Sequence, residues 1–119
     1  MNENPSNRIE MLRELVAEDP ADASAAFLLG RELLNAGHAA EAIAAFAAAI
    51  GADPDYAAAY RQMGNAQEAA GHVDDAIATY RRGMAVAERT NDLQAGKEMS
   101  AFLKRLARAG SAPPGDPPP

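Results

Sequence analysis

The sequence has no cysteine, and only three phenylalanines and three tyrosines supply its aromatic side chains. Without cysteine, neither disulfide bonds nor thiol chemistry can operate. With 5% aromatic residues, a core built from many large rings is excluded as well. The chain does contain thirty alanines, and 48% of its residues are hydrophobic. This composition favours closely packed helices with small residues at their contacts.

Long apolar runs and a cationic surplus are also missing. No stretch approaches the length of a transmembrane helix, and residues 1–20 carry no apolar signal core. The net charge of −6 argues against nucleic acid as the main partner, because phosphate binding needs a cationic surface. We therefore expect a cytoplasmic protein that binds neither membrane nor nucleic acid.

The dominant feature is an internal repeat of 34 residues, in which residues 23–56 align with residues 57–90. The first copy has Ala26, Leu29, Gly30 and Leu33 on one side of a predicted helix, and Ala42, Ile43, Phe46, Ala49 and Ile50 on one side of a second. Nine positions are identical in the two copies: Ala23/Ala57, Ala25/Ala59, Gly30/Gly64, Ala36/Ala70, Gly37/Gly71, His38/His72, Ala42/Ala76, Ile43/Ile77 and Ala44/Ala78.

This pattern resembles the tetratricopeptide repeat, a helix–turn–helix unit with the same period. The matching residues are Ala26-x2-Leu29-Gly30-x2-Leu33, Ala42-x3-Phe46 and Pro54, and then Tyr60-x2-Met63-Gly64-x2-Gln67 and Ala76-x3-Tyr80. The resemblance implies an all-α fold: a short right-handed α-solenoid of antiparallel helix pairs. A pair of short helices buries too little apolar surface alone, so such units stack.

The repeat divides the chain into a helical domain at residues 6–109 and two ends predicted to be disordered, residues 1–5 and the proline-rich tail 110–119. Residues 6–19 form a half-repeat helix, because Asp19-Pro20 repeats as Asp53-Pro54. Residues 23–56 and 57–90 are the full repeats, and residues 91–109 form a capping helix that fits the pattern after a slip of two residues. We expect helices at 6–18, 22–36, 39–52, 56–70, 73–90 and 92–109.

Candidate binding residues follow from the resemblance, because in this family the first helix of each repeat lines a concave groove. The positions beside the packing stripe give the predicted peptide-binding groove, composed of Phe27, Arg31, Leu34, Asn35, Arg61, Asn65, Glu68, Lys97, Lys104 and Arg105. This set has five cations and one acid, which favours an acidic peptide. Phe27 is either an exposed anchor for the partner or part of the core.

No combination of residues indicates catalysis. The two histidines, His38 and His72, follow the turn glycines, and Asp74 and Asp75 lie in the first turn of a helix, where negative charge is favourable. We therefore predict no enzyme activity, no cofactor and no metal. The predicted partner is another protein or peptide. A homodimer or other homo-oligomeric structural protein, and a regulatory subunit of an enzyme, remain alternatives.

Overall fold

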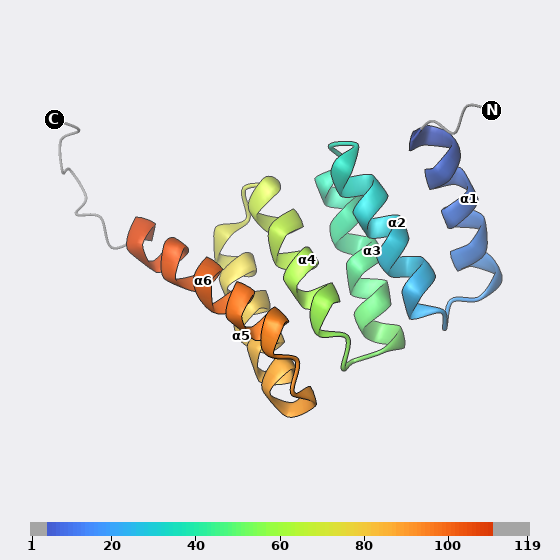
Figure 1. The fold of residues 1–119 in the computed structure, drawn as a ribbon. Helices are drawn as coiled ribbons and strands as arrows, with labels where there is room; N and C mark the ends of the chain where they lie inside the picture. The colour runs from blue at the N-terminus through green and yellow to red at the C-terminus, as the bar shows by residue number, and fades with distance from the viewer. Residues whose placement is uncertain (1–4, 111–119) are drawn as a thin grey trace, which may run out of the picture.

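The computed structural model describes residues 5–110. Pro5 and Gly110 were predicted to belong to the disordered ends, but Pro5 begins α1, since proline is tolerated in the first turn of a helix, and Gly110 ends α6. The rest of the predicted disordered ends, residues 1–4 and 111–119, lies outside the described residues. The described residues form six α-helices and no strand, as the repeat predicted. They lie side by side in chain order, with α1 at one end and α6 at the other (Figure 1). Both ends of each helix lie within one residue of their predicted positions. The helices are α1 (Pro5–Glu18), α2 (Ala23–Asn35), α3 (Ala39–Ala52), α4 (Ala57–Ala69), α5 (Val73–Thr90) and α6 (Leu93–Gly110).

The helix pairs α2–α3 and α4–α5 are held together by an aromatic ring against a glycine. Phe46 of α3 packs on Gly30 of α2, and Tyr80 of α5 packs on Gly64 of α4. Both glycines are buried, so the small residue lets the two backbones approach. The turn inside the first pair needs glycine for a different reason, because Gly37 has a φ of 86°, which favours a residue without a side chain.

The helix α1 covers one side of α2. Ile9 and Leu12 are buried in the common core. Two ion pairs add to this contact, one between Arg8 and Glu32 (3.0 Å) and the other between Arg13 and Glu41 of α3 (2.5 Å). The half-repeat helix is therefore docked on the stack through a narrow apolar stripe with charged groups beside it.

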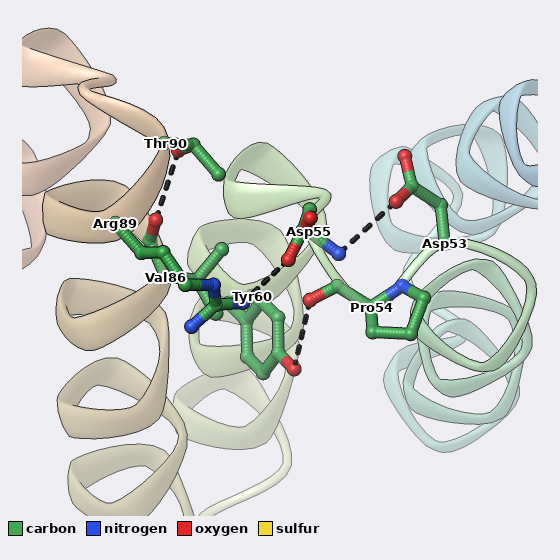
Figure 2. A network of polar contacts seen from close by, with 7 residues as sticks. All are labelled: Asp53, Pro54, Asp55, Tyr60, Val86, Arg89 and Thr90. Atoms are coloured by element: carbon green, nitrogen blue, oxygen red, sulfur yellow. Dashed lines mark hydrogen bonds and ion pairs between the residues drawn. The ribbon is translucent and has the colours of Figure 1, made fainter.

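The helix α5 is longer than α3, which explains the two-residue slip predicted from the sequence. It has 18 residues against 14 in α3, and it ends where Asn91 adopts the left-handed conformation with φ 60°. Its last turn reaches the loop between α3 and α4, where Arg89 forms an ion pair with Asp55 and Tyr60 donates to the carbonyl of Pro54 (Figure 2). The extra turn thus ties α5 to the connection between the two repeats.

The helix α6 packs against both α5 and α4. Its buried side chains are Ala95, Met99 and Leu106, and Met99 lies against Gly83 of α5. None of the six described helices is long and apolar enough to cross a membrane.

Candidate functional site

The predicted groove residues belong to α2, α4 and α6, the first helix of each repeat in chain order. We define the α2–α4–α6 face as the surface formed by the side chains of these helices that do not pack against α3 or α5. On α2 the exposed stripe of this face consists of Ser24, Leu28, Arg31 and Asn35. On α4 three of the corresponding side chains, Ala58, Gln62 and Asn65, are half-buried and the fourth, Ala69, is exposed; α6 packs against this helix.

Two ion pairs join α4 to α6 across this face. Arg61 Nη1 lies 2.6 Å from Glu98 Oε1, and Arg105 Nη2 lies 2.9 Å from Glu68 Oε2. The sequence had suggested a groove with Glu68 as its single acid, and here the structure differs. Glu98 neutralises Arg61 and Glu68 neutralises Arg105, so the α4–α6 part of the face is polar but balanced in charge. The Nε of Arg61 is buried and has no partner among the described residues.

The hydroxyl of Tyr80, which lies on α5, completes this polar cluster. It lies 2.6 Å from Glu68 Oε2 and 2.7 Å from Asn65 Oδ1. A hydroxyl carries one proton, and the charged carboxylate is the stronger acceptor, so the Tyr80 hydroxyl donates its proton to Glu68. Sequence reasoning missed this role of Tyr80, although one signal was present: the equivalent residue of the first repeat is Phe46, which has no hydroxyl.

The cluster shifts the pKa of three of its members. Burial raises the pKa of Glu68, but hydrogen bonds from Arg105 and Tyr80 outweigh burial, so the pKa lies below its ordinary value. Burial and the neighbouring Glu68 carboxylate raise the pKa of the Tyr80 hydroxyl far above its ordinary value. The hydrogen bond to Glu68 raises the pKa of Arg105. The carboxylate is therefore ionised and the hydroxyl protonated at neutral pH.

At the other end of the face, Phe27 lies partly in the core. Its ring stacks on Tyr56 with centroids 4.9 Å apart and is tilted against Phe46 at 5.8 Å. Phe27 is half-buried, and so is Leu34, which also packs on the core, whereas Arg31 and Asn35 are exposed. Leu28, which is not among the predicted groove residues, is exposed on this side of α2 and adds an apolar contact surface.

The structure places Lys97 and Lys104 apart from Arg61 and Arg105, with which they were predicted to share a peptide-binding groove. Both line an open groove between α5 and α6, Lys97 together with Met84 and Lys104 together with Ile77. The residues that the structure brings together on α4 and α6 are Arg61, Asn65, Glu68 and Arg105, joined by Glu98 and Tyr80.

A metal-binding arrangement is not found among residues 5–110. That part of the chain has no cluster of three or more histidine, aspartate or glutamate side chains that could hold a metal ion. His38 and His72 occupy the N-cap positions of α3 and α5 without a side-chain capping hydrogen bond.

Comparison with known proteins agrees with the repeat architecture. The family model described as "Tetratricopeptide repeat" matches residues 2–87. A TPR repeat-containing protein of Pseudomonas aeruginosa is 37% identical over 101 residues, which cover 85% of this chain and 96% of that protein.

Solved structures show the same fold. The TPR2B domain of yeast Sti1 has a TM-score of 0.81 at 22% identity, with 88% of this chain and 84% of that domain covered. A protein of Bordetella parapertussis has a TM-score of 0.77 at 26% identity, with 93% and 96% covered.

Proposed function

Because this chain belongs to the tetratricopeptide repeat family, we propose that it is a non-catalytic interaction module that binds a peptide or helix of another protein along its α2–α4–α6 face. Members of this family are in general protein–protein interaction modules. The yeast Sti1 domain, which has the same fold, was solved as a complex with pHsp70. The observation that carries the proposal is the continuity of this face, which runs from the exposed Leu28 and Arg31 to the polar cluster on α4 and α6.

The two halves of the face favour different parts of a ligand. On α2, Leu28 is exposed and Phe27 is half-buried, so an apolar side chain of the ligand can be buried there. On α4, Arg61 and Asn65 are one helical turn apart, a spacing at which a guanidinium and an amide can both donate to one carboxylate. An acidic group of the ligand would have to displace Glu98 from Arg61. The ligand that fits best is therefore a segment with an apolar residue and an acidic residue.

The location of the site is tested by selecting peptides from a displayed random library on the full chain and measuring their affinity by fluorescence anisotropy. Leu28→Lys and Arg31→Glu change exposed side chains, so the melting temperature should stay the same while affinity for the selected peptides falls at least about tenfold, or about 1.4 kcal/mol. The matched controls are Ala44→Lys and Ala48→Glu on the exposed side of α3. Equal loss of affinity in the controls, or none in the α2 variants, would place the binding site elsewhere.

A further inference from the structure

The first half-repeat exposes two large apolar side chains at positions that are buried in the other repeats. The period of 34 residues aligns Met11 and Leu15 of α1 with Ala45 and Ala49 of α3. Ala45 is 7% exposed and Ala49 is fully buried, whereas Met11 is 50% and Leu15 is 45% exposed. Because they are one helical turn apart, Met11 and Leu15 form one exposed apolar patch, and such patches mark interaction surfaces more often than single exposed residues do.

The geometry of the repeat explains why these positions are buried elsewhere. The residue of α5 that corresponds to Leu15 is Gly83, and it is enclosed by Tyr60 of the preceding helix α4 and Met99 of the following helix α6. In α1 the following helix α2 is present, but no helix among residues 5–110 takes the place of the preceding one. Met11 and Leu15 therefore lie where the first helix of a pair would pack.

At the opposite end of the stack, α6 lacks a second helix to pair with among the described residues. An open groove runs along α5 and α6 as two adjoining hollows of about 340 and 320 Å³, both lined by Met84 and Ser100. With the two-residue slip, Ser100 corresponds to Gly30 and Gly64, the positions against which the second helix of each pair places its aromatic ring. Among the described residues no helix follows α6, so this small position faces the groove instead.

The charges beside α1 are opposite to those of one of the two hollows. Glu14 and Glu18 share the outer side of α1 with Met11 and Leu15, at helical spacings of three and four residues. Arg81 and Lys104 line one of the two hollows, which has no acidic residue in its lining, and neither forms an ion pair within residues 5–110. The adjoining hollow is lined by Lys97 together with Glu88 and Asp92. By count from the sequence, residues 1–60 carry three basic and ten acidic side chains (net −7), and residues 61–119 carry eight and seven (net +1). The acidic side of α1 is therefore complementary in charge to the hollow that Arg81 and Lys104 line.

We propose that α1 of one molecule packs into the α5–α6 groove of a second copy, where it supplies the helix that would complete the repeat begun by α6. Met11 and Leu15 enter the apolar hollow beside Ser100, while Glu14 and Glu18 approach Arg81 and Lys104. The contact joins two different surfaces, so it is a head-to-tail contact that leaves one free end on each side and allows growth beyond a dimer. It uses neither Arg61 nor the stripe of α2, and it is independent of peptide binding on the α2–α4–α6 face.

The proposal is tested with the full chain by sedimentation velocity over a wide range of concentrations. The weight-average mass of the unmodified chain should rise above that of a monomer with concentration. A head variant, Met11→Gln with Leu15→Gln, and a tail variant, Arg81→Glu with Lys104→Glu, should each remain monomeric with unchanged helix content. A control variant, Ala44→Gln with Ala48→Gln on the exposed side of α3, should associate like the unmodified chain.

Mixing the two variants distinguishes this arrangement from a symmetric dimer. The tail variant keeps an intact α1 and the head variant keeps an intact groove, so an equimolar mixture should form a one-to-one complex that does not grow further. A mixture that stays monomeric would overturn the proposal, because a head-to-tail contact needs only one intact surface from each molecule. An unmodified chain that is monomeric at every concentration would also overturn it, and would leave the groove to a helix of a different protein.

Discussion

The ring of Phe46 lies so close to Gly30 that a Cβ atom built on this glycine would stand 2.5 Å from ring atom Cε1. The second repeat has the same relationship between Tyr80 and Gly64. Both rings are completely buried, so they cannot move aside without disturbing the core. The contact between the two helices of each repeat therefore depends on the absence of a single methyl group.

Substitution of these glycines should destabilise the fold. Gly30→Ala and Gly64→Ala are each expected to lower the free energy of unfolding by about 1–3 kcal/mol, because the added carbon overpacks the contact. Gly51 of α3 is the matched control, since a Cβ there would meet nothing within 4 Å. Gly51→Ala should stabilise by about 0.5–1 kcal/mol through helix propensity. Urea unfolding followed by circular dichroism measures all three, and equal effects at the three positions would contradict the packing argument.

Removal of the Tyr80 hydroxyl tests the polar cluster separately from the packing of the ring. Tyr80→Phe keeps the ring on Gly64 but loses the hydrogen bond to the Glu68 carboxylate, which should cost about 1.5–3 kcal/mol of unfolding free energy. Tyr60→Phe is the control, because its hydroxyl makes only a long contact of 3.4 Å to the carbonyl of Pro54 and should cost no more than about 0.5 kcal/mol. A Tyr80→Phe variant as stable as the parent would mean that the hydroxyl does not stabilise the fold.

The lowered pKa of Glu68 predicts an acid-dependent loss of stability. A carboxyl group with a lower pKa in the folded chain than in the unfolded chain stabilises the fold fully above the ordinary value of 4.5, and this contribution is lost as the pH falls through the folded pKa. The difference in urea midpoint between the parent and Glu68→Gln should be constant near neutral pH and shrink below pH 4.5. A difference that persists unchanged into strong acid would contradict the ionic role of Glu68.

Much of the fold was predictable because the repeat encodes it locally. The 34-residue period places Gly30 and Phe46 at the offset that makes them pack, and it does the same for Gly64 and Tyr80. The slip of two residues before α6 was also visible in the sequence. Its cause in the structure is the longer α5, which has no proline corresponding to Pro54 to end it.

The polar site was less predictable because it depends on how each helix is rotated about its axis. Lys97 and Glu98 are adjacent on α6 and point about 100° apart, so a small difference in rotation decides which of them meets Arg61. In the structure Glu98 does, and Lys97 lies beside the α5–α6 groove. The 34-residue repeat specifies which sides of the helices pack, but contacts between side chains of different repeats also depend on their rotamers and are not periodic.

The ion pair between Arg61 and Glu98 predicts that substitutions of its two members change the affinity for an acidic peptide in opposite directions. Glu98→Gln keeps the size of the side chain but removes the charge that neutralises Arg61 at 2.6 Å. A fluorescein-labelled acidic peptide should then bind more tightly, and more so at low salt, because Arg61 no longer has to leave an ion pair. Arg61→Gln should weaken binding of the same peptide.

A lysine-rich peptide of equal length is the control and should respond in the opposite direction or not at all. If both substitutions weaken binding of the acidic peptide, Arg61 does not bind a carboxylate of the peptide. The loss of affinity would then reflect a change in the packing of α4 on α6.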